Sequence, residues 1–131
     1  MFPSSLLLLP TDMTYILYID TSGNFSRIML FDREKIRATR ITTEANQHAQ
    51  SINTHIEQVM HEAGIKWDQL SAVAVLNGPG SYTGLRIGLA TAKGFCYAMD
   101  IPLILLNHLD LMLFCSDEKK PAPIYFLKAR E

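Results

Sequence analysis

The sequence predicts an α/β fold in which a mixed sheet packs against helices, with the element order β-β-β-α-β-α-β-α. Three observations support this prediction. Short apolar runs separated by polar turns occupy residues 15–42 and indicate antiparallel hairpins. Apolar residues then recur at helical spacing, and the later apolar runs alternate with helix-like segments. The 131 residues, 48% of them hydrophobic, suffice for one domain with a substantial core.

The first three strands are expected at Tyr15–Asp20, Ser26–Phe31 and Ile36–Thr42. The polar stretches TSGN and DREK separate them and contain residues that favour turns. Because strands joined by short turns run antiparallel, this part of the sequence predicts a series of hairpins.

A helix is expected next, because apolar side chains form one stripe at helical spacing and Gly64 follows where a helix often ends. The stripe consists of Ala49, Ile52, Ile56, Val59, Met60 and Ala63. Ser71–Leu76 is then a continuous apolar run, which is typical of a strand buried on both faces.

The second half of the chain continues this alternation. Leu85–Met99 is expected to form a helix that ends before Pro102, and Ile101–Leu106 is expected to form another buried strand. A last helix is expected from Asn107, as its N-cap, to about Cys115. The string IYFL at residues 124–127 would begin a further strand.

The amino-acid composition of the chain limits which kinds of partner it can bind and in which compartment it is expected. The net charge of −1 and pI of about 6.4 give this chain no basic excess with which to grip nucleic acid alone, and leave open a weak RNA contact shared with a partner. Cys96 and Cys115 lie in apolar surroundings without a closely spaced partner, which favours free thiols in a reducing, cytoplasmic compartment. The leucine run at residues 6–9 is too short to span a bilayer, so no membrane association is expected.

A glycine-rich stretch, NGPGSYTGLRIGLATAKG, occupies residues 77–94 between a strand and a helix. It is not a Walker A loop, because no glycine is followed directly by lysine, and it is not a Rossmann fingerprint, because Thr83 stands where the third glycine is needed. Backbone amides at the helix N-terminus and the hydroxyls of Ser81 and Thr83 would nevertheless suit an anion.

Close packing is the competing interpretation of the same glycines. Gly84, Gly88 and Ala92 recur every four residues and would form a small-residue ridge on one helix face. Since glycine inside a helix costs about 1 kcal/mol relative to alanine, the ridge indicates close backbone approach, within this chain or to a second subunit. Arg86 in the first turn opposes the helix dipole, so it calls for an anion, a carboxylate or a partner surface.

The strings GPGSYTGLRIG and ILYIDTS resemble the patterns GPGSFTGLRIG and ILAIDTS of the TsaB (YeaZ) family, which is grouped with the glycoprotease (peptidase M22-like) proteins. DIPLILLNHLDLM similarly resembles the family string GIPLVGVSSLEAL, and the resemblance covers residues 13–131. The related TsaD proteins share GPG but not the SYTGLR that follows, which favours TsaB.

The resemblance implies the ASKHA (actin-like ATPase, ribonuclease-H-like) fold of two related subdomains. Residues 13–118 would form the first subdomain. Because Met13 directly precedes the first expected strand, residues 1–12 are interpreted as a non-core N-terminal extension, and a tail packed on a neighbour is the alternative. Residues 119–131 would be a linker and the first strand of a truncated second subdomain.

The implied role is that of a non-catalytic scaffold in the machinery that makes threonylcarbamoyladenosine in tRNA, where TsaD carries the metal and the transfer chemistry. Expected partners are TsaD-like and TsaE-like proteins or a second copy of this chain, with tRNA reached only through the complex. No cofactor is expected, and ATP only at an interface shared within the complex. The residues expected at a partner interface are Gly84, Arg86, Gly88 and Ala92. The alternative is an ATP-binding or peptidase-like (M22 glycoprotease) enzyme.

Two loops are the candidates for a vestigial phosphate site, because the first of them lies where active ASKHA proteins keep a phosphate loop. Their residues are Asp20, Thr21, Ser22, Gly78, Gly80, Ser81 and Thr83. A capped hairpin turn is the competing interpretation of residues 20–24, since aspartate, serine, glycine and asparagine commonly form turns.

Neither a catalytic residue nor a metal site is expected. The string around Ser81 does not match the G-x-S-x-G nucleophile elbow, and the sequence pairs no histidine with it. His48, His55 and His61 are spaced by seven and six residues, whereas metal-binding pairs are typically spaced by three to five.

Overall fold

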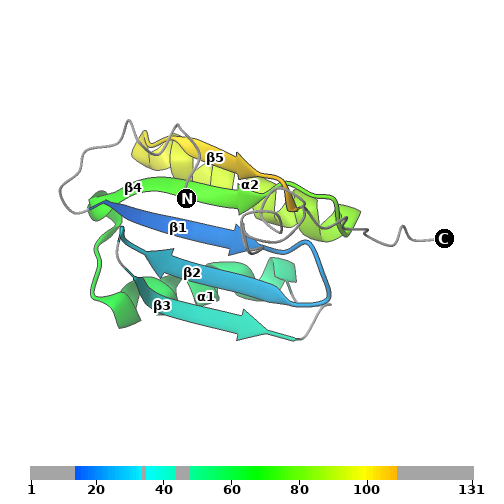
Figure 1. Cartoon of the computed structure of the whole chain (residues 1–131), viewed down its shortest axis with the longest axis horizontal. Coiled ribbons are helices and arrows are strands. Elements are labelled where there is room, and N and C mark those ends of the chain that lie inside the picture. The colour runs from blue at the N-terminus through cyan, green and yellow to red at the C-terminus, as the bar shows by residue number, and fades with distance from the viewer. Residues whose placement is uncertain (1–13, 34, 44–47, 109–131) are drawn as a thin grey trace, which may run out of the picture.

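Five strands pair in the order β3-β2-β1-β4-β5 in the computed structural model, which describes residues 14–33, 35–43 and 48–108. The strands are β1 (Tyr15–Asp20), β2 (Ser26–Phe31), β3 (Ile36–Thr42), β4 (Leu70–Leu76) and β5 (Leu103–Leu106). Two helices, α1 (His48–Ala63) and α2 (Tyr82–Met99), lie along one face of this sheet (Figure 1), and a short 3₁₀ turn, η3 (Trp67–Gln69), precedes β4.

The sheet is mixed, as the sequence predicts. β1 pairs antiparallel with β2, and β2 antiparallel with β3, so the first three strands form the expected hairpins. β4 and β5 run parallel to β1, because a helix crosses over before each of them. The predicted order is confirmed through β5; the last predicted helix beyond His108 and the strand at residues 124–127 lie outside the described residues.

Local sequence explains where the elements begin and end. β1, β2 and β3 occupy the predicted bounds, because polar turns separate them. α1 ends at Ala63, and Gly64 follows with a φ of 69°, the left-handed conformation that glycine adopts easily after a helix. α2 begins at Tyr82, three residues earlier than the predicted Leu85, because Ser81 is its N-cap.

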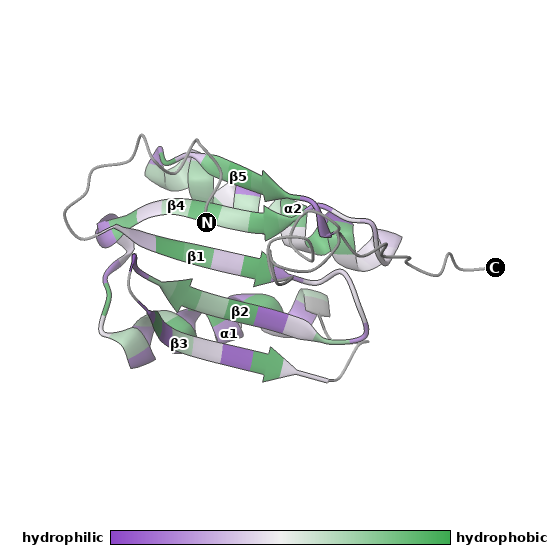
Figure 2. Ribbon diagram, in the orientation of Figure 1, coloured by the Kyte–Doolittle hydropathy of each residue, from purple (hydrophilic) through white to green (hydrophobic). Residues whose placement is uncertain are grey.

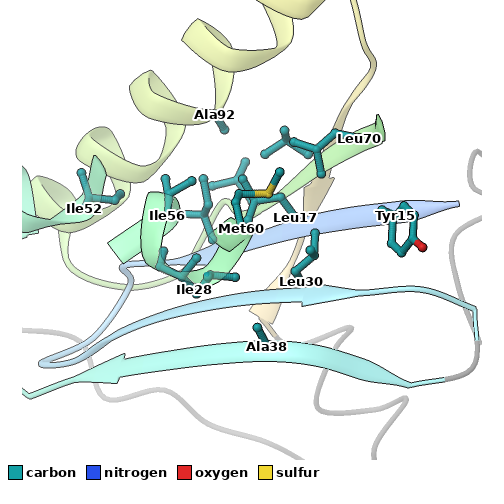
Figure 3. Close-up of a cluster of buried hydrophobic side chains, with 14 of the residues drawn as sticks. Tyr15, Leu17, Ile28, Leu30, Ala38, Ile52, Ile56, Met60, Leu70 and Ala92 are labelled. Carbon is teal, nitrogen blue, oxygen red and sulfur yellow. The ribbon is translucent and has the colours of Figure 1, made fainter. Parts of the chain in front are cut away.

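The main hydrophobic core lies between the sheet and the two helices (Figure 3). Leu17 and Ile19 project into it from β1, and Ile52, Ile56 and Met60 meet them from α1. Trp67 and Phe95 stack beside this core with ring centroids 5.1 Å apart. The predicted α1 stripe therefore points into the core, apart from Ala49, which is exposed.

The opposite face of the sheet carries a second, smaller cluster, because alternate residues of a strand point to opposite faces. Its buried members are Ile16, Tyr18, Ala72, Ala74 and Ile104. All six residues of β1 are consequently buried, and hydrophobic colour predominates along β1, β4 and β5 in Figure 2.

Candidate functional site

The carboxyl ends of β1, β4 and β5 meet at one edge of the sheet, because these three strands are parallel neighbours. Open α/β sheets usually bind ligands at such an edge. The turn that follows Asp20, the loop that follows Leu76 and residues 107–108 are therefore brought together. This edge contains both predicted phosphate loops and is the candidate site.

The turn after β1 is capped by its own side chains. Asp20 is buried, and its Oδ1 accepts hydrogen bonds from the backbone N–H of Ser22 at 3.0 Å and from the Ser22 hydroxyl at 2.7 Å. An aspartate that accepts from a backbone amide two residues ahead forms an Asx turn. The capped-turn interpretation is confirmed. The Ser22 hydroxyl, which is one of the predicted phosphate contacts, donates its hydrogen bond to Asp20 instead.

The loop after β4 is fixed on both sides by backbone hydrogen bonds. The Ser81 N–H donates to the Ser22 carbonyl oxygen at 2.7 Å, which joins this loop to the turn after β1. On the other side, Asn77 N–H donates to Leu106 O, and His108 N–H donates to Gly78 O, both at 2.8 Å. Gly78 has a φ of 112°, a conformation that other residues rarely adopt.

Little space separates the two predicted phosphate loops. A Cβ added to Gly80 would lie 2.6 Å from the Ser22 carbonyl oxygen and 2.8 Å from the Ser22 Cβ. The glycine at this position therefore permits close packing of the two loops.

The Thr21 and Ser81 hydroxyls also make internal hydrogen bonds. Thr21 Oγ1 donates to Gly84 O at 2.5 Å, and Ser81 Oγ accepts from Gly84 N–H at 3.4 Å as the N-cap of α2. Thr83 is exposed in the first turn of α2. Among the polar side chains predicted at this edge, Thr83 is the one on an exposed residue, which leaves it as the candidate contact for an anion.

The small-residue ridge packs inside this chain, which corrects its prediction as a partner interface. Gly84, Gly88 and Ala92 are all buried. A Cβ on Gly84 would overlap the Thr21 carbonyl oxygen, and a Cβ on Gly88 would overlap Thr21 Oγ1. The expected close backbone approach is real, but the neighbour is the end of β1, so these three residues are not available to a partner.

The opposite side of α2 is exposed and carries two tyrosines. Tyr82 is 73% exposed and Tyr97 92% exposed, and the Arg86 guanidinium carbon lies 5.5 Å from the centroid of the Tyr82 ring. Lys93 is exposed on the same side of the helix. We call Tyr82, Arg86, Lys93 and Tyr97 the outer stripe of α2. Of these, only Arg86 was predicted from the sequence, although a helical projection of residues 82–97 groups all four.

The described residues at this edge include few side chains that could act in catalysis or bind a metal ion. Within residues 14–33, 35–43 and 48–108, no three side chains of histidine, cysteine, aspartate or glutamate come together to hold a metal ion. His108 was not identified from the sequence; its Nδ1 is buried at this edge and has no hydrogen-bond partner among the described residues. Among the described helices, none is long and apolar enough to cross a membrane.

The family model and the curated sequences that resemble this chain carry the same name. The family model described as TsaD, tRNA N6-adenosine threonylcarbamoyltransferase, matches residues 36–129. The tRNA N6-adenosine threonylcarbamoyltransferases of Streptococcus pyogenes serotype M5 (strain Manfredo) and serotype M49 (strain NZ131) are each 44% identical over 77 residues, which are 59% of this chain and 22% of theirs. The matched region thus spans about a fifth of these relatives' length.

Comparison with solved structures supports the predicted fold. YeaZ from Pseudomonas aeruginosa, and a protein of that organism with similarity to peptidase YEAZ, each superpose with a TM-score of 0.68 at 24% identity; the matches cover 72% of this chain and 44% and 43% of theirs. RuvC of T. thermophilus, solved with a Holliday junction substrate, gives 0.51 at 13% identity over 75% of this chain and 67% of its own. The ASKHA, ribonuclease-H-like fold and the structural resemblance to YeaZ are confirmed, whereas the sequence matches bear the TsaD name.

Proposed function

The chain belongs to the TsaD family of tRNA N6-adenosine threonylcarbamoyltransferases, and from this premise we propose that it is a TsaB-like, non-catalytic scaffold subunit in tRNA threonylcarbamoylation. In this role it pairs with a TsaD-like protein, which carries the metal and the transfer chemistry. A TsaE-like ATPase joins the same complex.

The observation that carries this proposal is the exposed outer stripe of α2. Tyrosine and arginine are enriched at protein interfaces and often contribute most of the binding energy. A side chain as exposed as Tyr97 adds nothing to the core of this chain, so its aromatic surface is available to a partner. The outer stripe replaces the buried ridge as the proposed contact surface, and Arg86 belongs to it.

The candidate site supports a non-catalytic role. The Asp20 carboxylate accepts two hydrogen bonds within its own turn, and the Thr21 and Ser81 hydroxyls also bond within the chain. A nucleophile needs a base within hydrogen-bond reach. Nothing among the described residues pairs Ser81 with such a base, so no observation favours the peptidase or ATPase alternative.

A binding experiment tests the proposal. The full chain and the TsaD-like protein of the same genome would be mixed, and their affinity measured by isothermal titration calorimetry. We expect Tyr97→Ala to weaken binding at least about tenfold, since interface tyrosines frequently contribute more than about 1.4 kcal/mol.

Asp68→Ala is the matched control, because Asp68 is exposed on η3 and lies outside the outer stripe. Its affinity should equal that of the wild type. If the wild type does not bind the TsaD-like protein, or if Tyr97→Ala binds as tightly as Asp68→Ala, the proposed interface is wrong.

A further inference from the structure

Positive charge is concentrated at one edge of the sheet, although the net charge of the chain is only −1. Residues 27–43 contain five of the twelve lysines and arginines but only two of the thirteen acidic residues. The rest of the chain is therefore clearly negative, and the overall charge conceals an uneven distribution. Figure 2, which is coloured by hydropathy, shows hydrophilic segments on β2 and β3, beside the mainly hydrophobic β1, β4 and β5.

The charged side chains lie on an exposed edge strand. β3 is the last strand of the described sheet and pairs with β2 alone. Four cations are exposed along it and in the turn before it, and we call them the basic edge: Arg33, Lys35, Arg37 and Arg40. The ion pair that the described residues form here joins Arg37 to Asp32 at 2.5 Å, so the other three cations stay uncompensated by a described acid.

Other groups on β3 add hydrogen-bond donors to this charge. Thr39 is exposed beside the cations, and an edge strand leaves backbone N–H groups unpaired on its outer side. Arginine, lysine, threonine hydroxyls and backbone amides are the groups with which proteins contact nucleic-acid phosphates. If the chain is extended from Lys35 to Arg40, it spans about 16 Å, roughly the rise of five nucleotides in one strand of a duplex.

We propose that the basic edge contacts the phosphate backbone of RNA, and specifically of the tRNA on which the complex works. This inference rests on the proposed function, because it assigns that substrate to a surface of this chain. The contact is sequence-independent and weak when the chain is alone, and it adds to the affinity of the assembled complex.

A protein partner is less well matched to this edge. The centres of protein interfaces are depleted of charged residues, whereas surfaces that bind nucleic acid are strongly positive. The position also suits RNA, because α1 packs against β2 and β3 while α2 packs against β4. A protein bound at the outer stripe of α2 therefore leaves the basic edge exposed (Figure 1).

Salt-dependent binding of fluorescently labelled, unmodified tRNA to the full chain tests this proposal. The variant Arg33→Gln/Lys35→Gln/Arg40→Gln removes three edge charges and retains the Arg37–Asp32 ion pair. The control Lys66→Gln/Arg86→Gln/Lys93→Gln has the same net charge, with its substitutions on exposed positions away from the basic edge. It serves as a control for tRNA binding alone, because Arg86 and Lys93 belong to the outer stripe of α2. Circular dichroism would verify that both variants fold.

We expect the edge variant to bind tRNA at least about tenfold more weakly than the control at about 50 mM salt. The slope of log K against log salt should fall by about 2 to 3, because each phosphate contact contributes about 0.7 to 0.9. Equal slopes for the two variants, or no tRNA binding by the wild type, would overturn the proposal. The charges would then only protect the edge strand from pairing with other chains.

Two further results separate this inference from the proposed function. If the edge variant binds tRNA normally but loses the TsaD-like protein, the basic edge is a protein contact and the RNA proposal is wrong. If Tyr97→Ala retains the TsaD-like protein while the edge variant loses tRNA, the proposed scaffold interface fails and the RNA contact holds.

Discussion

Alanine at Gly88 should destabilise the protein, and removal of one atom of Thr21 should reverse the effect. Gly88 lies in α2, where a new Cβ would overlap Thr21 Oγ1. The next contacts, with Ile19 Cγ2 at 3.5 Å and Val75 Cγ2 at 3.6 Å, are ordinary van der Waals distances. The Thr21 hydroxyl is therefore the obstacle, and Thr21→Ala removes it.

The expected magnitudes follow from three opposing contributions. Alanine in place of glycine inside a helix is favourable by about 1 kcal/mol. Overpacking costs about 1 to 3 kcal/mol, and displacing the Thr21 hydroxyl from Gly84 O costs about 1 kcal/mol more. Gly88→Ala should therefore lower the free energy of unfolding by about 1 to 3 kcal/mol. In the Thr21→Ala background the same substitution should be neutral or stabilising by up to about 1 kcal/mol.

Urea unfolding, followed by the fluorescence of Trp67, the single tryptophan, gives the four free energies of this double-mutant cycle. Gly94→Ala is the matched control on the same helix, because no atom lies within 4 Å of its added Cβ. It should stabilise the protein by up to about 1 kcal/mol. If Gly88→Ala behaves like Gly94→Ala, or if the coupling with Thr21→Ala is below about 0.5 kcal/mol, the packing of this helix against β1 is wrongly described.

Three further predictions concern the same helix. Gly84→Ala should cost more than Gly88→Ala in urea unfolding, and Thr21→Ala should not rescue it, because its Cβ would overlap the Thr21 backbone carbonyl; rescue would contradict this geometry. Burial raises the pKa of the Cys96 thiol above its ordinary value of 9.0, so its contribution to stability is present below pH 9 and is lost as the pH rises through the folded-state pKa. The difference in unfolding free energy between wild type and Cys96→Ala should accordingly shrink above pH 9, and a constant difference would refute this. Phe95→Ala should shift the Trp67 emission to longer wavelength, since the stacked ring is removed, whereas an unchanged spectrum would contradict the stacking.

Most of the fold could be predicted because its signals are local. The polar turns around β2 locate the first three strands to the residue, and the continuous apolar run of β4 reveals a strand buried on both faces. The start of α2 was missed because Ser81 was considered for anion binding, although a serine before a helix is also a strong N-cap.

The candidate site could be predicted only in part. The pattern of Gly84, Gly88 and Ala92 indicates close packing, but it does not reveal the neighbour, because Thr21 is 63 residues from Gly84 in the sequence. The two interpretations of Asp20 differ in how its carboxylate is bonded, and that depends on the conformation of the turn. The exposed position of the α2 tyrosines, by contrast, could have been predicted from helical periodicity alone.

The hydrogen bond from Ser81 N–H to Ser22 O has a consequence for local stability. Loops rich in glycine usually open easily, and their amides exchange quickly with solvent. The Ser81 amide joins the turn after β1 to the loop before α2, and the hydrogen bond from Thr21 Oγ1 to Gly84 O holds the same two segments together. Exchange of the Ser81 amide therefore requires the end of β1 and the start of α2 to separate. The slow hydrogen exchange expected for Ser81 would identify the glycine-rich loop as part of the cooperative core.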